Sequence, residues 1–202
     1  CRSRSYLIDT AADLKRKLIA LLDRIFPEYE SLFDPVFGKA SIAVLRKYPT
    51  PQKIKNAHLG KLTELLMESS GGHFGEWKAR QLKEAAQNSF GIDDSCGVYS
   101  TLLGMFLEQI LSLTDQADSL EKQIASLLKE FDSQLTSIPG IGTVLAAMIL
   151  SEIGNISRFS SSDKLLAYAG LDPSVKQSGE FSSNQNRMSK RGSPYLRRAI
   201  WL

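Results

Sequence analysis

A long run of heptad-spaced apolar residues constrains the fold of this chain more than any other feature of its sequence. Apolar side chains recur at alternating steps of four and three at Tyr99, Leu103, Phe106, Ile110, Leu113, Ala117, Leu120, Ile124, Leu127 and Phe131. This spacing keeps one apolar face along a helix and indicates a coiled coil. A helix of about 35 residues is roughly 50 Å long, so we expect its apolar face to pair with another helix.

A second, shorter pattern of the same kind lies near the start of the chain. Its members are Leu7, Ala11, Leu14, Leu18, Leu21 and Ile25, and Pro27 ends the predicted helix because it lacks an N–H donor. We expect the two helices to pair in antiparallel fashion. The longer face has surplus apolar surface, so we also expect self-association of the chain through the coiled coil, as a dimer or tetramer.

The segment between the two patterns is predicted to be a small helical insert, because proline and glycine divide it into short helical stretches. These stretches are 39–47, 51–56, 59–69 and 76–90. Ser95 precedes the long helix and is expected to cap it. The predicted fold is all-α, with a coiled-coil stem at 1–134 (helices at about 6–26 and 98–132, insert at 27–97) and a helix-hairpin-helix-like C-terminal domain at 135–202 that carries a mobile loop.

Composition narrows the functional classes. The two cysteines form no CxxC pair and the two histidines have no metal-ligand spacing, so neither a disulfide framework nor a metal site is expected. No run of 18 apolar residues is present, so no membrane partner is expected. The cysteine usage favours a reducing compartment, and the predicted location is the bacterial or archaeal cytoplasm, in association with the nucleoid. Residues 174–202 hold six basic residues against one acidic residue, which suggests a polyanionic partner, although a solvated basic helix end is an equal alternative.

The sequence "IPGIG" at 138–142 predicts a tight turn that leads into a helix. Proline fixes one backbone dihedral, and Gly140 and Gly142 leave main-chain N–H groups bare at the positive end of the following helix. A phosphate can bind there, as in helix-hairpin-helix modules that contact the sugar-phosphate backbone. The alternative interpretation is an ordinary corner between two helices.

Four segments in this order and spacing extend the pattern: "IPGIG", "ISRFSSSDKLLAYAGLDP", "QSGEF" and "RMSKRGSPYLRRAI". Together they resemble the C-terminal domain of transposases of the insertion-sequence-110 family, which are DEDD-type, bridge-RNA-guided recombinases. The resemblance implies a two-part enzyme, in which an N-terminal RuvC-like domain binds divalent metal (Mg²⁺) and the C-terminal domain supplies a serine. The chain is therefore expected to be a fragment without its metal-binding domain, inactive by itself, with DNA and a structured guide RNA as partners.

The resemblance also implies roles for individual residues. The serine that attacks DNA lies directly before a glycine and shortly after the "GLDP" segment, which corresponds to Ser178. Residues implied to hold the nucleic-acid backbone are Gly140, Gly142, Lys176, Arg187, Lys190, Arg191, Arg197 and Arg198. Glu180 departs from the family pattern, which often has a second small residue after Ser-Gly.

The residues alone leave alternatives open. Ser178-Gly179 is also typical of a plain loop turn, and Tyr195 is a rival nucleophile because Arg197 and Arg198 follow it. Ser182, Ser183, Ser189 and Ser193 are weaker candidates. At the level of function, the alternatives are a non-enzymatic helix-hairpin-helix module that binds nucleic acid and oligomerises, and a coiled-coil assembly module with an incidental basic end.

Overall fold

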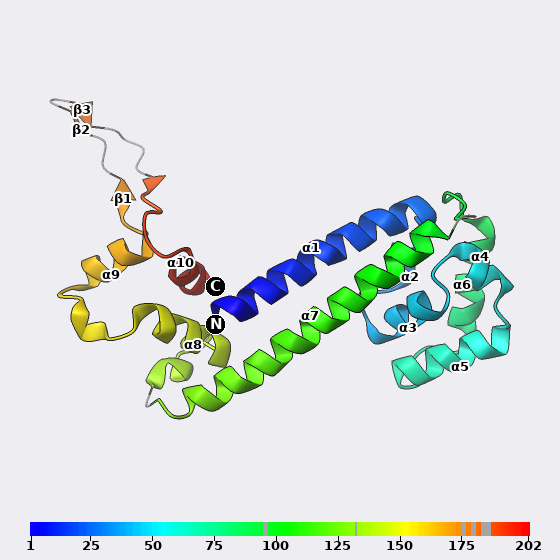
Figure 1. Cartoon of the computed structure of the whole chain (residues 1–202), viewed down its shortest axis with the longest axis horizontal. Coiled ribbons are helices and arrows are strands. Elements are labelled where there is room, and N and C mark those ends of the chain that lie inside the picture. The colour runs from blue at the N-terminus through cyan, green and yellow to red at the C-terminus, as the bar shows by residue number, and fades with distance from the viewer. Residues whose placement is uncertain (95–96, 132, 175–176, 179–180, 183–186) are drawn as a thin grey trace. The chain divides into compact units, whose positions relative to one another are not determined.

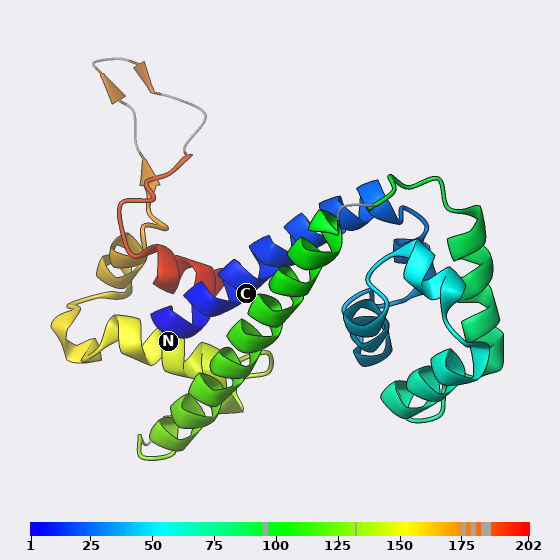
Figure 2. The ribbon, with the colours of Figure 1, turned by 45° about the vertical axis from the view of Figure 1, so that its right-hand side comes forward.

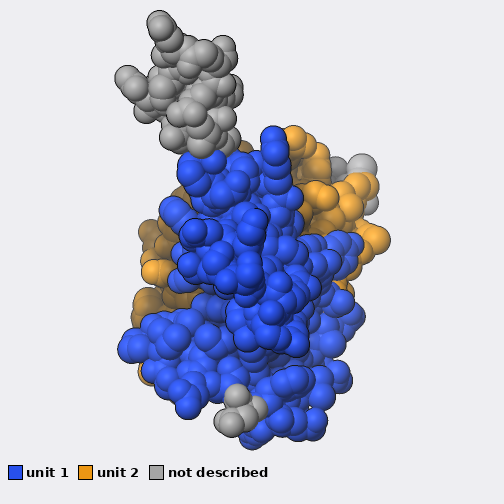
Figure 3. Space-filling view, turned by 90° about the vertical axis from the view of Figure 1, so that its left-hand side faces the viewer, with its two compact units in different colours: residues 1–6, 116–202 blue, residues 7–115 orange. Residues whose placement is uncertain are grey.

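The computed structural model describes residues 1–94, 97–131, 133–174, 177–178, 181–182 and 187–202, and of residues 174, 177–178 and 181–182 it describes the main chain. Most of the described chain is helical and its strands are only two residues long, which confirms the all-α prediction (Figure 1). The chain forms two compact units: unit 1 is residues 1–6 and 116–202, and unit 2 is residues 7–115 (Figure 3). None of the described helices is long and apolar enough to cross a membrane.

Two long helices contribute to both units. They are α1 (Arg2–Ile25) and α7 (Val98–Leu128), and Figures 1 and 2 both show them alongside each other in opposite directions. In unit 2, Leu18 of α1 and Leu103 of α7 are fully buried in one core cluster. The antiparallel pairing predicted from the two apolar patterns is therefore present in this unit.

The predicted apolar line on α7 needs a correction. Leu103, Ile110 and Ala117 are buried as predicted, but the residue buried between the first two is Leu107, whereas Phe106 is half-buried. The helix also ends at Leu128, and Phe131 beyond it is 65% exposed. The reason is geometric. The residues three and four positions after a buried residue both lie on the same face of the helix, and the packing partner determines which of the two is buried.

Short helices complete unit 2, and proline or glycine lies at several of their ends. They are α2 (Tyr29–Leu32), α3 (Lys39–Lys47), α4 (Pro51–Asn56), α5 (Leu59–Ser70) and α6 (Glu76–Asn88). Helix α4 begins with Pro51 after Thr50, whose hydroxyl accepts the N–H of Lys53 at 3.3 Å. Helix α5 ends at Gly71, whose φ of 62° allows a left-handed cap. These helices share their core with α1 and α7.

The start of α7 is held by an acidic residue. The Asp94 carboxylate accepts the N–H groups of Tyr99, at 3.0 Å, and Ser100, at 2.7 Å. Ser95, the cap predicted from the sequence, lies outside the described residues. A carboxylate at a helix N-terminus satisfies free N–H groups and complements the helix dipole.

Unit 1 combines short helices with two small β ladders. Its elements after α7 are η1 (Gln134–Ser137), α8 (Thr143–Ile153), η2 (Ile156–Arg158), α9 (Ser162–Ala169), β1 (Pro173–Ser174), β2 (Gln177–Ser178), β3 (Phe181–Ser182), β4 (Arg187–Met188) and α10 (Pro194–Trp201). Helix α10 packs on α8 and α9 through buried Leu196 and Ala199. Strand β1 pairs with β4 and β2 pairs with β3, both antiparallel.

Candidate nucleic-acid interface

The "IPGIG" segment forms the predicted turn between η1 and α8. The N–H of Ile141 donates to the carbonyl of Ile138 at 3.0 Å, and Gly140 has a φ of 92°. A side chain at Gly140 would strain the backbone, because L residues rarely adopt this φ. Gly142 is the N-cap of α8, and it has no atoms within 4 Å of the position that a Cβ would take.

The N-terminus of α8 is open to an incoming anion. No side chain caps it, and Gly140, Gly142 and Thr143 are all exposed. The first N–H groups of a helix have no partner within the helix, and the helix dipole places positive potential there. A phosphate oxygen can therefore approach the main chain at this turn, which is the chemistry that the sequence predicted for Gly140 and Gly142.

A second feature is the close contact of two glycines at the base of the "GLDP" segment. Gly170 ends α9 with a φ of 70°, and a Cβ at Gly192 would lie 2.4 Å from the N of Gly170 and 2.0 Å from the carbonyl oxygen of Tyr168. These distances leave no room for any side chain at position 192. The main chain of "SKRG" therefore lies directly against the end of α9.

Hydrogen bonds fix this contact from both sides. The N–H of Ser193 donates to the carbonyl of Tyr168 at 3.0 Å, and the N–H of Lys190 donates to that of Gly170 at 3.1 Å. Ser189 donates its N–H to the carbonyl of Asp172 at 2.9 Å and its hydroxyl to the Asp172 carboxylate. Ser189 and Asp172 therefore hold the two ends of the intervening loop together.

The predicted nucleophile lies beyond this base. Strands β1 and β4 pair with Ser174 opposite Arg187, and further along the chain β2 and β3 pair with Ser178 opposite Phe181. The structure therefore describes the main chain of Ser178, while its side chain lies outside the description. Lys176, Ser183 and Glu180 also lie outside the described residues, and of Ser182 only the main chain is described.

The remaining predicted basic residues do not form a uniform set. Arg187, Lys190, Arg191 and Arg198 are exposed. Arg197 differs, because it is half-buried and its Nη1 donates to the carbonyl of Ala169 at 3.0 Å. This bond satisfies a free carbonyl at the end of α9, so Arg197 contributes to the fold as well as to the local charge.

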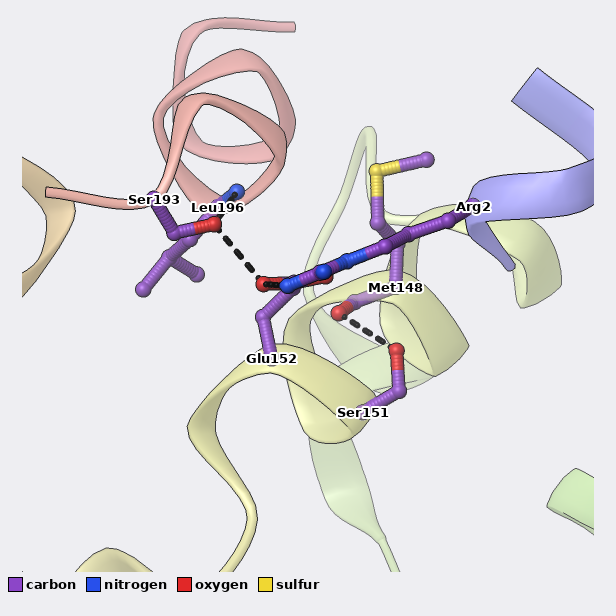
Figure 4. Close-up of polar contacts among 6 residues, drawn as sticks. All are labelled: Arg2, Met148, Ser151, Glu152, Ser193 and Leu196. Carbon is purple, nitrogen blue, oxygen red and sulfur yellow. Dashed lines mark hydrogen bonds and ion pairs between the residues drawn. The ribbon is translucent and has the colours of Figure 1, made fainter. Parts of the chain in front are cut away.

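A buried carboxylate network supports the same region, and sequence reasoning missed it. Glu152 on α8 is 6% exposed and accepts two hydrogen bonds from Arg2, at 2.6 and 2.8 Å, and one from the Ser193 hydroxyl at 2.7 Å (Figure 4). Ser193 is also the N-cap of α10, accepting the N–H of Leu196 at 3.2 Å. The Arg2 hydrogen bonds, followed by that of Ser193, hold the pKa of Glu152 below its ordinary value of 4.5 despite desolvation.

The rival nucleophile, Tyr195, lies beside this network. The Arg2 guanidinium lies over its ring at 4.8 Å, which is a cation–π contact. This packing gives Tyr195 a structural role. The one sequence signal that could have found the network is Glu152 itself, the single charged residue in an otherwise apolar helix.

Comparisons with known proteins match the region that contains the four quoted sequence segments. Residues 132–202 match the family described as Transposase IS116/IS110/IS902 family. Over 201 residues the chain is 26% identical to an uncharacterized 44.8 kDa protein of insertion element IS116 from Streptomyces clavuligerus, which covers 98% of this chain and 49% of that protein.

Two further relatives match shorter stretches. The chain is 34% identical over 101 residues to the pilin gene-inverting protein of Moraxella bovis (47% of this chain, 31% of that protein). It is 31% identical over 90 residues to the transposase for insertion sequence element IS1328 of Yersinia enterocolitica (44% and 27%). The chain spans about half the length of the first of these curated relatives.

Proposed function

Through residues 132–202 the chain belongs to the IS116/IS110/IS902 family of transposases, and from that premise we propose that it supplies the serine-bearing, nucleic-acid-binding part of a DNA transposase or recombinase. In this proposal Ser178 is the nucleophile. The phosphate-binding elements are the turn at Gly140 and Gly142 together with the exposed basic residues Lys190 and Arg191.

One observation carries the proposal. The loop that bears Ser178 begins and ends at a rigid base, where Gly170 meets Gly192 and Asp172 meets Ser189. A nucleophile must be held within tenths of an ångström of its target, so a fixed base is what a reactive loop needs. The exposed cations Lys190 and Arg191 lie in the turn that forms this base, and cations stabilise the negative charge of a phosphoryl transition state.

The proposed step is attack of the Ser178 hydroxyl oxygen on a DNA phosphorus. A serine–phosphate ester bond forms, the bond from phosphorus to one deoxyribose oxygen breaks, and that oxygen leaves as a hydroxyl after taking up a proton. A base must remove the serine proton, because the neutral hydroxyl is a weak nucleophile. The nearby carboxylates of known geometry are already engaged: Asp172 by Ser189 and Glu152 by Arg2.

The side chains that the structure describes do not form a site for the divalent metal that the family resemblance implies. Among the residues that the structure describes, no group of three or more His, Cys, Asp or Glu side chains is placed to hold a metal ion. We therefore assign the metal, and the base associated with it, to acidic residues of the protein outside these 202 residues. The chain by itself is expected to bind nucleic acid without cutting it.

Partners follow from the same proposal. DNA contacts the α8 turn and the basic residues through its backbone, which positions it without reading sequence. A structured guide RNA is the second proposed partner. Self-association is proposed through α7, where Leu102 and Met105 are exposed although they lie on an apolar helix.

The test is made in the full-length protein with Ser178→Ala, and Ser182→Ala serves as the matched control. Ser178→Ala is expected to abolish strand exchange and any covalent protein–DNA adduct while DNA binding persists, whereas Ser182→Ala retains both activities. Wild-type exchange by Ser178→Ala would refute Ser178 as the nucleophile.

A second candidate function is a non-enzymatic module that binds nucleic acid through main-chain contacts. The observation that favours it is the open, uncapped N-terminus of α8. It predicts salt-sensitive binding that depends on Gly142 and the basic residues, and no adduct under any condition. Trapping an adduct therefore separates the two functions.

A further inference from the structure

An arginine and two aromatic rings form a cluster between η2 and α9, in which Arg158 and Tyr168 are exposed and Phe159 is half-buried. The Arg158 guanidinium carbon lies 4.7 Å from the ring centre of Phe159 and 4.5 Å from that of Tyr168. The two rings are themselves in contact, with centroids 5.3 Å apart and a tilt of 57°. Arg158, Phe159 and Tyr168 are called the Arg158 cluster below.

The described contacts of this guanidinium are with the two aromatic rings. Within the described part of the chain, Arg158 makes no side-chain hydrogen bond or ion pair, although it is exposed. Three other arginines of unit 1 bind protein groups through their side chains: Arg2 binds Glu152, Arg4 binds Glu121 and Arg197 binds a carbonyl. Among the described residues, therefore, none accepts a hydrogen bond from the N–H donors of the Arg158 guanidinium.

The cluster is joined to the base of the Ser178 loop. Tyr168 is 36% exposed, while its carbonyl accepts the N–H of Ser193 and lies against Gly192. The ring of Tyr168 thus belongs to the Arg158 cluster, and the carbonyl of the same residue belongs to the base of the Ser178 loop. A ligand on the Arg158 cluster would be held close to the loop that carries the proposed nucleophile.

The composition of the cluster indicates which part of a nucleic acid it fits. A phosphate needs only N–H donors and charge, which a lysine or an isolated arginine supplies. A guanidinium plane supported by aromatic rings offers in addition a flat surface on which a base can stack. Bases in a duplex are covered on both faces by their neighbours, whereas an unpaired base has faces to offer.

We propose that the Arg158 cluster binds an unpaired nucleobase of a single-stranded nucleic acid by stacking, with the Arg158 N–H groups free to contact the adjoining phosphate. This inference rests on the proposed function, because it requires that the chain bind nucleic acid at all. The two aromatic rings fix the guanidinium before binding, so little side-chain entropy is lost when the base arrives.

The experiment measures affinity by fluorescence anisotropy with three probes: an oligothymidine, a strand of the same length with abasic sites in place of the bases, and a duplex. Arg158→Lys is the main variant, because it keeps the charge and removes the plane. Tyr168→Leu removes one ring, and Lys164→Ala is the matched control that removes a nearby exposed charge from α9 without affecting the cluster. Thermal denaturation verifies that each variant is folded.

The wild-type chain is expected to bind oligothymidine more tightly than the abasic strand. Arg158→Lys and Tyr168→Leu should each weaken oligothymidine binding by about five-fold or more, the effect of losing one stacked base, while abasic and duplex affinities stay within about two-fold. Lys164→Ala should weaken all three probes alike. Equal weakening of all three probes by Arg158→Lys would make Arg158 a simple phosphate ligand and overturn the proposal.

Two other results overturn it and are distinguishable. If the wild-type chain binds none of the probes at low salt, the proposed function and this inference both fail. If it binds all three and Arg158→Lys binds each with wild-type affinity, only the inference about the cluster fails.

Discussion

Replacing Glu152 with glutamine tests whether the buried carboxylate network stabilises unit 1. The side chain of Glu152 is 3% exposed, and it accepts from both Arg2 and Ser193. Glutamine keeps the shape but loses the charge and one acceptor oxygen, so at least one donor loses its partner. Each hydrogen bond to a buried charged group contributes about 1.5–3 kcal/mol.

The expected loss is smaller than the sum of these bonds. Arg2 is 62% exposed, so water replaces much of what its guanidinium loses and the ion pair is screened. The bond from Ser193 remains, together with the cost of burying a polar amide that is only partly satisfied. We expect Glu152→Gln to lower the free energy of unfolding by about 1–2 kcal/mol, which corresponds to a Tm lower by about 2–8 °C for a chain of this size.

The pH dependence gives the sharper result. The pKa of Glu152 is lowered in the folded state, so the network contributes its full stability above the ordinary value of 4.5 and loses it as the pH falls through the lower, folded-state pKa. Thermal denaturation followed by circular dichroism should therefore show a Tm gap between wild type and Glu152→Gln that is complete at pH 7 and closes in acid.

A matched control is Glu121→Gln. Glu121 also accepts two hydrogen bonds from one arginine, at 2.6 and 3.0 Å from Arg4, but its side chain is 44% exposed. The change should cost less than about 0.5 kcal/mol, as exposed ion pairs do. If Glu152→Gln unfolds at the wild-type Tm at pH 7, or if its gap does not depend on pH, the assigned role of the network is wrong.

Three further predictions concern the glycine contact and the basic turn. Gly192→Ala should lower the Tm by several degrees, because a Cβ would lie 2.0 Å from the carbonyl oxygen of Tyr168; a wild-type Tm would contradict the contact. Gly142→Ala should leave the Tm within about 2 °C, because open space surrounds that position, yet weaken binding to duplex DNA measured by anisotropy. Replacing Lys190 and Arg191 together with alanine should reduce the slope of log affinity against log salt by about two, and an unchanged slope would exclude them as phosphate contacts.

Helix boundaries were well predicted wherever local chemistry sets them. Pro51 begins α4 and Leu59 begins α5, at the first residues of the stretches predicted from the sequence. These signals are local, because the φ of proline and the freedom of glycine do not depend on distant parts of the chain. The same reasoning gave the IPGIG turn, in which Gly140 adopts a positive φ.

Side-chain partners were predicted less well, for physical reasons that the sequence does not carry. Periodicity placed Phe106 on the buried line of α7, but the structure fully buries Leu107, because the partner surface decides between adjacent columns. The Glu152 network joins residues 150 and 41 positions apart, and no local pattern links them. The catalytic role of Ser178 stays a prediction, because its side chain lies outside the described residues.

The contact between Gly170 and Gly192 has a consequence for how such loops can vary. The two ends of the loop are held together by main-chain contacts and by the Asp172–Ser189 hydrogen bond. These contacts at the ends do not involve the side chains of the segment between them. The free-energy cost of closing a flexible loop, which is entropic, rises slowly with loop length, by about 0.6 kcal/mol for each doubling. Insertions, deletions and whole replacements between the anchors are therefore cheap in stability, and this loop can diversify in sequence and reach while the helices around it stay unchanged.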